Sequence, residues 1–444
     1  MKLNNKRTVL VGLAFLSICA FWQMYDNVVP LILTKTFHLN ETFSGAIMAA
    51  DNVLALFLLP FFGTLSDRTS SRLGKRTPYI LAGTAAAVVI MNILPLLDNG
   101  YYESPSTGKM VAFVILLGFL LVAMGTYRSP AVALMPDVTP KPLRSRANAI
   151  INLMGAVGGI IYLAVAAVMY PNSKVLGLEH VNYQPLFLVV SVIMIVSIAV
   201  MLATIREPQL TAENQALEAK HPEWNLAQDD GSGNEVLPQN VRRSLMFLLA
   251  SIALWFIGYN GITTWFTTYV DQVMGQGLGG ASTCLLIATG GAIISYIPIG
   301  HIAHRIGRKR TIMIGIVLLA ACFLGGFFLT TAFHSINAVM FIVFALVGFA
   351  WAAINVNSLP MVVEMCRGSD IGKFTGYYYT ASMAAQVVTP ILAGFLMRNV
   401  SYKVLFPYAA FFVAMSFITM TQVRHGDAAP EAKGGLEAFE DMDD

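Results

Sequence analysis

The sequence predicts an all-α membrane protein in which twelve transmembrane helices form two pseudo-symmetric six-helix bundles. Three observations lead to this fold class: the composition, twelve long apolar runs, and a pattern of loop residues that occurs twice. Hydrophobic residues make up 56% of the 444 residues, and charged residues make up only 12%. A soluble domain carries about 25% charged residues, so this chain has too few charges to cover a surface that faces water.

The twelve apolar runs are long enough to cross a bilayer, because a helix needs ~20 mainly apolar residues to span the hydrocarbon layer. Backbone polar groups find no water partner in lipid, so each run is expected to be helical. The predicted spans are 9–34, 43–65, 78–97, 110–134, 147–170, 184–205, 243–270, 281–302, 311–332, 337–360, 374–397 and 403–423.

The positive charges predict the orientation of these spans. Most of the 28 Lys and Arg residues fall on the side that holds both termini. Cytoplasmic loops of membrane proteins carry such an excess. We therefore expect an integral plasma (inner) membrane protein with both termini in the cytoplasm.

The longest polar interruption divides the spans into two groups of six. We predict an N-terminal bundle over 1–205, a cytoplasmic linker over 206–242 and a C-terminal bundle over 243–424. The remaining residues, 425–444, are acidic and are expected to form a disordered cytoplasmic tail. The four cysteines show no paired spacing, so neither a disulfide nor a metal site is predicted.

Two loops, one in each half, share a pattern: a glycine, an acid or histidine four residues later, and then a glycine followed by basic residues. The first copy comprises Gly63, Asp67, Arg68, Gly74, Lys75 and Arg76, and the second comprises Gly300, His304, Arg305, Gly307, Arg308 and Lys309. A second echo follows the fourth and tenth spans, where Asp137 and Arg144 correspond to Glu364 and Gly372. Two echoes in the same order indicate an internal repeat, which is typical of transporters.

The first loop resembles the signature of the major facilitator superfamily. Its spacing from Asp67 to Gly74, and the segment that includes Tyr127 and Arg128, are similar to the glycoside–pentoside–hexuronide:cation symporters and their sucrose:proton branch. The resemblance implies a secondary active transporter that carries a sugar or glycoside together with protons by alternating access. Melibiose-type carriers place an acidic pair just before the proline of the second span. Here Leu58 and Leu59 take that place, which favours protons over sodium as the coupling ion.

Three charged residues lie deep inside predicted spans, where each charge costs ~2.5–3.5 kcal/mol on insertion scales. Asp26 shares a helix face with Gln23 and Asn27, and Asp51 and Arg128 lie in the second and fourth spans. We predict Asp26 and Asp51 as proton-coupling residues and Gln23, Asn27 and Arg128 as substrate-binding residues. Our hypothesis is that Arg128 pairs with one carboxylate in one state and releases it when protons or substrate bind. The alternative is a permanent structural ion pair.

The spans of the second half carry aromatic and amide side chains in place of buried charges. Such side chains suit a neutral, hydroxylated substrate, because amides bind hydroxyl groups and aromatic rings cover the apolar face of a sugar. The alternative is that they join helices to one another. The predicted substrate-binding residues are Tyr259, Asn260, Thr263, Thr264, Trp351, Asn355, Tyr379 and Gln386.

The charged loop residues are predicted to form a gate on the cytoplasmic side, by pairing with each other or with helix N-termini when that side closes. The alternative is that they only set the membrane orientation. The gating residues are Gly63, Asp67, Arg68, Gly74, Lys75, Arg76, Asp137 and Arg144.

Other functions remain open from the sequence. The same charges would serve a proton antiporter that exports drugs or metabolites, and a membrane sensor or a membrane-embedded enzyme is the non-transport alternative. No GxxxxGK[ST] phosphate-binding loop occurs, so ATP is not the expected energy source. We predict no enzyme activity, no cofactor beyond the coupling proton, no nucleic-acid partner, and a lipid-embedded monomer that binds a small molecule.

Overall fold

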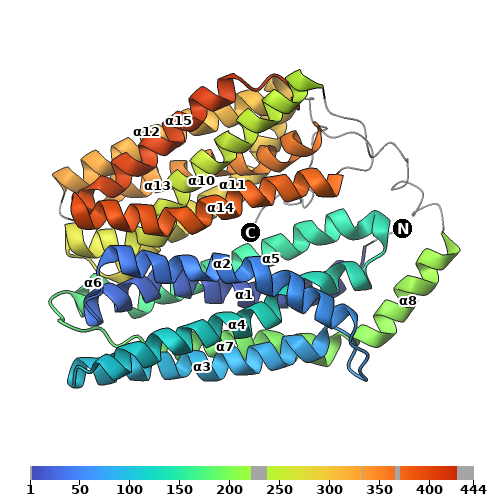
Figure 1. Cartoon of the computed structure of the whole chain (residues 1–444), viewed down its shortest axis with the longest axis horizontal. Coiled ribbons are helices and arrows are strands. Elements are labelled where there is room, and N and C mark those ends of the chain that lie inside the picture. The colour runs from blue at the N-terminus through green and yellow to red at the C-terminus, as the bar shows by residue number, and fades with distance from the viewer. Residues whose placement is uncertain (1–2, 222–237, 334, 366–370, 428–444) are drawn as a thin grey trace. The chain divides into compact units, whose positions relative to one another are not determined.

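The computed structural model describes residues 3–221, 238–333, 335–365 and 371–427, apart from the side chains of residues 145, 371 and 372. All regular structure in these residues is helical (Figure 1). Twelve helices are long and apolar enough to cross a membrane, and they coincide with the twelve predicted spans. The predicted fold class of a twelve-span helical membrane protein is therefore confirmed.

The chain forms two compact units. The six spanning helices of the first unit are α1 (Asn5–Leu31) with its π-helical extension η1 (Ile32–Thr36), α2 (Glu41–Asp67), α3 (Thr77–Glu103), α4 (Thr107–Val138), α5 (Arg144–Met169) and α7 (Gln184–Thr204). Three shorter elements accompany them: the 3-10 turn η2 (Lys141–Leu143) and the helices α6 (Asn172–Val175) and α8 (Glu207–Lys220).

The second unit repeats the six-helix plan. Its spanning helices are α10 (Gln239–Met274), α11 (Leu278–Ile306), α12 (Arg308–Ala332), α13 (Ala338–Val363), α14 (Ile371–Asn399) and α15 (Leu405–Thr421), and the short turn η4 (Tyr402–Val404) precedes the last of them.

The two units pack their helices in the same way. In the first, α1 packs against α5 and α7, α3 packs against α4 and α7, and α2 lies on α4. In the second, α10 packs against α14 and α15, α12 packs against α13 and α15, and α11 lies on α13. These pairs correspond one to one when the helices are counted in chain order. The repeat seen in two loops of the sequence therefore extends to the packing of all twelve spans.

Close helix contacts depend on glycine in both units. A Cβ atom at Gly158 of α5 would collide with the carbonyl oxygen of Leu16 on α1. A Cβ atom at Gly348 of α13 would collide in the same way with the carbonyl oxygen of Ala288 on α11. Small residues let helix backbones approach closely in lipid, where apolar burial provides no driving force between helices.

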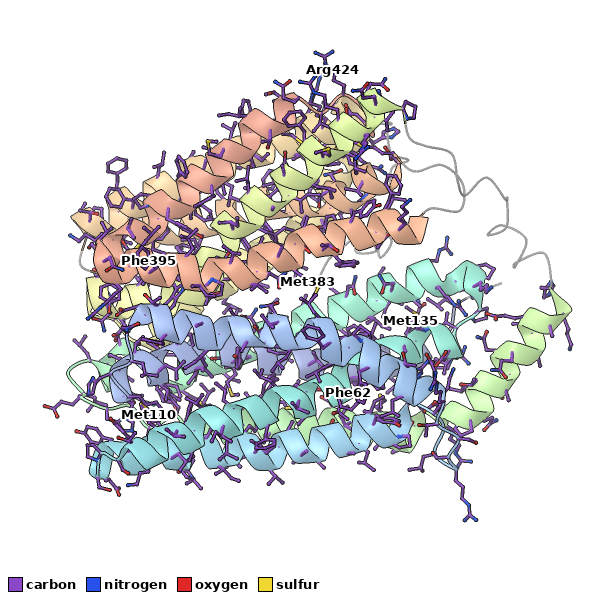
Figure 2. The ribbon with its side chains drawn as sticks, in the orientation of Figure 1. Phe62, Met110, Met135, Met383, Phe395 and Arg424 are labelled. Carbon is purple, nitrogen blue, oxygen red and sulfur yellow. The ribbon has the colours of Figure 1, made fainter. Side chains whose placement is uncertain are left out.

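Large apolar side chains cover the outside of the helices (Figure 2). Phe57 is 70% exposed, and Phe395 on α14 is 49% exposed. A soluble monomer rarely exposes apolar surface on this scale, whereas lipid solvates it well. The surface therefore fits the membrane environment that the composition predicts.

Two segments that the sequence assigns to a linker and a tail are folded against the units. The predicted linker begins with α8, which packs against α4. The predicted tail begins with His425, whose Nδ1 lies 2.8 Å from the hydroxyl of Ser244 on α10. The physical reason is the same in both places: the polar groups at the ends of the helices need hydrogen-bond partners, and these segments supply them. Residues 222–237 and 428–444 of the two predicted segments lie outside the described residues.

Candidate functional site

The three charged residues predicted inside the spans of the first unit lie near one another. They come from α1 (Asp26), α2 (Asp51) and α4 (Arg128). Asp51 is close enough to interact electrostatically with both Arg128 and Asp26. The backbone N–H and the side-chain amide of Asn52 also donate to Asp51 Oδ1, at 2.6 and 2.8 Å. The helices thus bring two carboxyl groups and one guanidinium group into one region of the unit.

Arg128 lies over an aromatic ring. Its guanidinium carbon is 5.9 Å from the centre of the Trp22 ring, a cation–π distance. Among the ion pairs of the described residues, none joins Arg128 to Asp26 or Asp51. The hypothesis that Arg128 exchanges partners therefore stays a prediction, and in this structure the guanidinium group lies over Trp22.

Three buried donors around Asp26 have no hydrogen-bond partner among the described residues. They are the Trp22 indole Nε1, the Tyr25 hydroxyl and the Tyr162 hydroxyl. Tyr25 and Tyr162 are both close enough to interact electrostatically with Asp26. A buried polar group without a partner costs ~1–3 kcal/mol, so a ligand or water that these donors bind would recover that cost.

The other two candidates on α1 behave differently from each other. Asn27 is buried and donates to the carbonyl oxygen of Gln23 at 2.6 Å, so its amide is used inside its own helix. Gln23 packs against α5, where a Cβ atom at Gly159 would lie 3.3 Å from its Cγ. Neither contact requires a substrate, and only that of Gln23 joins two helices.

In the second unit an aromatic pair joins α10 and α13. The rings of Tyr259 and Trp351 are stacked, with centroids 3.7 Å apart and planes 3° apart, and Phe256 meets the Trp351 ring edge-on at 5.3 Å. Asn260 Nδ2 and Asn355 Oδ1 are buried, and neither has a hydrogen-bond partner in the part of the chain that the structure describes. Two of the predicted substrate-binding residues thus provide a flat aromatic surface, and two others carry amide atoms that bind no other described residue.

The remaining candidates of this unit do not join that group. The Thr263 hydroxyl donates to the carbonyl oxygen of Asn260 at 3.2 Å, and Thr264 is half-buried on the same helix. On α14, Gln386 is half-buried and Tyr379 is 42% exposed. The Tyr379 ring meets its neighbour Tyr378 edge-on, with centroids 5.5 Å apart.

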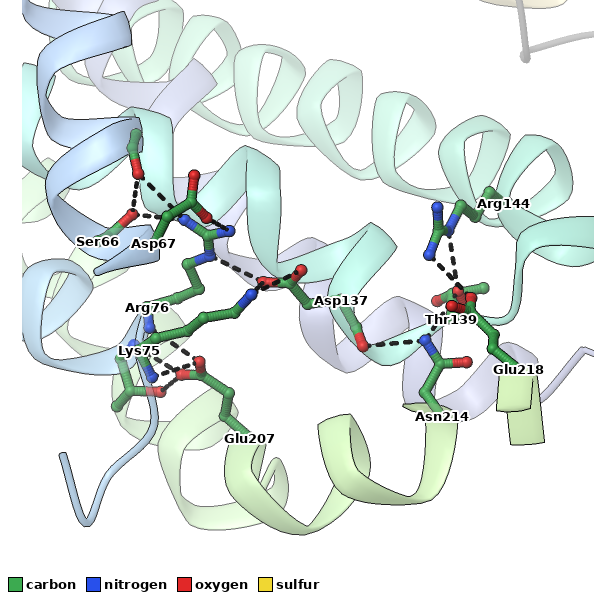
Figure 3. Close-up of polar contacts among 12 residues, drawn as sticks. Ser66, Asp67, Lys75, Arg76, Asp137, Thr139, Arg144, Glu207, Asn214 and Glu218 are labelled. Carbon is green, nitrogen blue, oxygen red and sulfur yellow. Dashed lines mark hydrogen bonds and ion pairs between the residues drawn. The ribbon is translucent and has the colours of Figure 1, made fainter. Parts of the chain in front are cut away.

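Four of the eight predicted gating residues belong to one network of ion pairs and hydrogen bonds at the end of the first unit that holds the N-terminus of α3. The network comprises Ser66, Asp67, Lys75, Arg76, Asp137 and Glu207, and we call it the Arg76 cluster (Figure 3). Arg76 Nε donates to Asp137 Oδ2 at 2.8 Å, and Nη1 donates to the Ser66 hydroxyl at 2.5 Å. Arg76 also pairs with Asp67. Burial opposes the charge of Arg76, but the hydrogen bonds and charges of Asp137 and Asp67 raise its pKa above the ordinary value.

Glu207, which the sequence assigns to the linker, occupies the N-terminus of α3. Its carboxylate accepts from the backbone N–H groups of Lys75, Arg76 and Thr77 at 2.7–2.8 Å, and from the Thr77 hydroxyl at 2.7 Å. Unpaired N–H groups and the helix dipole favour an anion at this position. Gly74 has a positive φ of 108°, and a Cβ atom there would collide with the Glu207 carboxyl group. Glycine therefore satisfies both the backbone and the space requirement.

Helix α8 continues across the end of α4 (Figure 3). Asn214 donates to the carbonyl oxygens of Asp137 and Thr139, at 3.1 and 3.4 Å. Arg144 donates to the Thr139 carbonyl at 3.1 Å and pairs with Glu218 at 3.0 Å. Arg144 thus anchors α8, whereas Arg68, another predicted gating residue, is exposed.

The second unit repeats the cluster with different residues. Arg308, which follows Gly307, pairs with Glu364, as Lys75, which follows Gly74, pairs with Asp137. Asp427 accepts from the backbone N–H of Lys309, the second residue of α12, at 2.8 Å. Gly307 has a positive φ of 91°, and a Cβ atom there would lie 3.0 Å from the Asp427 carboxylate.

Sequence reasoning missed Glu207 and Asp427 as members of these clusters. Both follow the sixth helix of their unit and reach back to its third helix. For Glu207 a local signal existed, because an acid followed by Pro208 is a typical start of a helix. The neighbouring sequence does not indicate that its carboxylate binds the N-terminus of α3. Among the described residues, no group of three or more His, Cys, Asp or Glu side chains is arranged to hold a metal ion.

Two repeated six-helix units with a charged loop cluster in each define a class of membrane transporters. The family model of the Major Facilitator Superfamily matches residues 11–328 and 275–439. The chain belongs to this superfamily, as its loop residues predict. It is therefore a transporter and not an enzyme.

The more specific similarity is to sucrose transport proteins of plants. The chain is 30% identical over 202 residues to sucrose transport protein SUT2 of Oryza sativa subsp. indica, an alignment that covers 41% of this chain and 40% of the relative. It is 31% identical over 147 residues to sucrose transport protein SUC3 of Arabidopsis thaliana, which covers 30% of this chain and 24% of the relative. The matched segments thus span less than half of these relatives.

Solved structures of the superfamily share the fold. A mutant of the nucleoside transporter NupG aligns with a TM-score of 0.67 at 13% identity, over 94% of this chain and 100% of that one. The xylose transporter XylE from E. coli, in an inward open conformation, aligns with a TM-score of 0.65 at 14% identity, over 95% and 96% of the two chains. At these identities the likeness concerns the fold alone.

Proposed function

We propose that this protein is a secondary active transporter that carries a sugar inward together with protons. The observation that carries the proposal is the cluster of Asp26, Asp51 and Arg128 in the first unit. Arg128 lies over Trp22 and forms no ion pair with another described residue. The segmental similarity to sucrose transport proteins supports a sugar as the substrate.

Proton coupling follows from the balance of charge in this cluster. Two carboxylates and one guanidinium group leave one negative charge uncompensated inside the bilayer, which is costly. A proton on one carboxyl group removes that cost. Arg128 then exchanges between an ion pair with the ionised carboxylate and the Trp22 ring, where its planar fork is free to bind two hydroxyl groups of the substrate.

The second unit carries side chains whose chemistry also suits a sugar. The stacked Tyr259 and Trp351 provide an aromatic surface for an apolar ring face. The unpartnered amide atoms of Asn260 and Asn355 provide one donor and one acceptor for hydroxyl groups.

Alternating access would make and break the two loop clusters. We propose that the Arg76 cluster is an element of the gate and that both termini lie in the cytoplasm of a plasma-membrane monomer. The excess of Lys and Arg on the side of the termini supports this orientation.

The test is uptake of radiolabelled sucrose by purified protein in proteoliposomes. We expect accumulation when the outside is acidic, no response to a sodium gradient, and loss of accumulation in Asp51→Asn with exchange of bound sugar retained. Accumulation driven by an acidic interior would instead indicate proton antiport. If labelled sucrose moved under neither gradient, a panel of other sugars would follow, and the absence of any flux would refute the proposal.

A further inference from the structure

The end of the first unit opposite the Arg76 cluster holds a deeply buried carboxyl group. Asp98 lies near the last turn of α3, and its side chain is 0% exposed. Neither of its oxygens makes a hydrogen bond among the described residues. The nearest charged partner is His180, whose Nε2 lies 3.8 Å from Asp98 Oδ2. None of the predicted coupling, substrate or gating residues is part of this region.

The hydrogen bonds around His180 determine where its proton sits. The backbone N–H of Gln184 donates to Asn182 Oδ1 at 2.9 Å, so this oxygen is an acceptor. Asn99 Nδ2 donates to the same oxygen at 2.9 Å, which turns Asn99 Oδ1 toward His180 Nε2, also at 2.9 Å. Because an amide oxygen only accepts, His180 Nε2 carries the hydrogen.

The other ring nitrogen is then free to take a proton. Nδ1 of His180 lies 3.4 Å from the Thr36 hydroxyl, which can donate to the neutral ring. The same hydroxyl is close enough to Asp98 to interact with its carboxyl group. The ring is also stacked on Tyr102, with centroids 4.6 Å apart and planes 13° apart. These contacts fasten the loop before α7 to both η1 and α3.

The charges that face His180 come from each surrounding element. Asp98 and the Tyr102 phenol lie on α3, Glu179 precedes His180 and accepts from the Tyr102 hydroxyl at 3.2 Å, and Lys35 is adjacent to Thr36 on η1. Burial lowers the pKa of His180 below its ordinary value. The packed arrangement is therefore that of the neutral imidazole.

We propose that Asp98 and His180 form a proton-binding site that fastens or releases this end of the first unit. A proton from the medium adds to the lone pair of His180 Nδ1, the Thr36 hydroxyl turns to accept it, and the imidazolium then faces the Asp98 carboxyl group. η1 continues directly from α1, the helix that carries Asp26. A proton bound at the site therefore changes how firmly the end of that helix is held.

The direction in which pH changes the stability of this end of the unit follows from the lowered pKa of His180. A histidine whose pKa is lower in the folded state contributes stability that is complete above its unfolded pKa of ~6.5 and is lost as the pH falls through the folded value. Acidification therefore loosens the contact between the loop, η1 and α3.

The experiment is thermal unfolding of the purified full chain in lipid nanodiscs from pH 4.5 to 8. Titrating groups that do not contact His180 or Asp98 contribute equally to all variants, so the difference between two melting curves isolates this pair. His180→Gln should remove one step from the pH profile of the melting temperature. His301→Gln, a change on α11 in the second unit, should reproduce the wild-type profile.

Asp98→Asn provides the second variant, because it keeps the shape of the buried group and removes its charge. The imidazolium then loses its counter-charge, and the midpoint of the step should move to lower pH by ~1 unit or more. A step that persists in His180→Gln, or an unchanged midpoint in Asp98→Asn, would overturn the proposal. The assay uses no substrate, so its outcome is independent of the proposed sugar transport.

Discussion

In both units a carboxylate binds the N-terminus of the third helix, but the carboxylate of the first unit is more buried and accepts more hydrogen bonds. In the first unit Glu207 is 2% exposed, and its carboxylate accepts four hydrogen bonds at the N-terminus of α3. In the second unit the exposed Asp427 accepts one backbone hydrogen bond at α12. Both loops keep the positive-φ glycine that makes room for the carboxylate. The backbone requirement has been preserved in both copies, while the strength of the contact has diverged.

The transmembrane parts of the two units differ in a second way. The first unit brings together Asp26, Asp51 and Arg128, whereas the corresponding part of the second unit has the Tyr259–Trp351 stack. A duplicated fold therefore supports two chemistries, an ionisable one and an aromatic one. The loops of the two units thus keep the same helix-end contact, whereas the spans between them carry different kinds of side chain.

The largest effect on stability is expected from a substitution that breaks the stronger of the two loop contacts. In Glu207→Gln one carboxylate oxygen becomes an NH₂ group, which faces the donors of Thr77 and leaves them without an acceptor. We expect the protein to lose about 2–3 kcal/mol of stability and ~4–12 °C of melting temperature. Glu213→Gln, an exposed change on the same helix, is the control. Equal melting temperatures for the two variants would show that the contact has no energetic role.

The second effect concerns transport and the buried charges. Arg128→Lys keeps the positive charge but removes the planar fork that binds two acceptors and stacks on Trp22. We expect about a tenfold loss of kcat/KM for proton-driven sugar uptake in proteoliposomes, which is ~1.4 kcal/mol. Arg310→Lys, an exposed change in the second unit, should leave uptake unchanged. Normal uptake and proton flux in Arg128→Lys would rule out the bidentate role.

A smaller effect should appear at the weaker loop contact. Asp427→Asn replaces a charged acceptor at the N-terminus of α12 with a neutral one at an exposed position. Such a helix-terminal charge is worth ~0.3–1 kcal/mol, so the melting temperature should fall by no more than ~4 °C. A loss as large as that of Glu207→Gln would contradict the difference between the two units.

The smallest effect should come from the aromatic pair. Trp351→Phe keeps a stacked ring beside Tyr259 but reduces its area, so we expect KM for the sugar to rise about two- to fivefold with kcat retained. Tyr377→Phe, which changes an exposed side chain of α14, is the matched control. A fall in kcat without a change in KM would assign Trp351 to the conformational step and not to substrate binding.

The sequence by itself determined the twelve helices, their division into two similar halves and the superfamily. These features are local. A run of apolar residues must become a helix in lipid wherever it lies in the chain. The motif of a glycine followed by basic residues can be read directly from the sequence at Gly74 and again at Gly307. The buried charges were also evident, because Asp26, Asp51 and Arg128 interrupt apolar runs.

Only the tertiary structure decided which of these residues meet. Glu207 binds the backbone of Arg76, which is 131 residues away in the sequence. Arg128 packs over Trp22, which lies on another helix. Tyr259 likewise stacks on Trp351 of another helix. The physical reason is that the rotation and depth of a helix depend on the side chains of its neighbours. A contact between distant segments therefore has no local signature until the helices have packed.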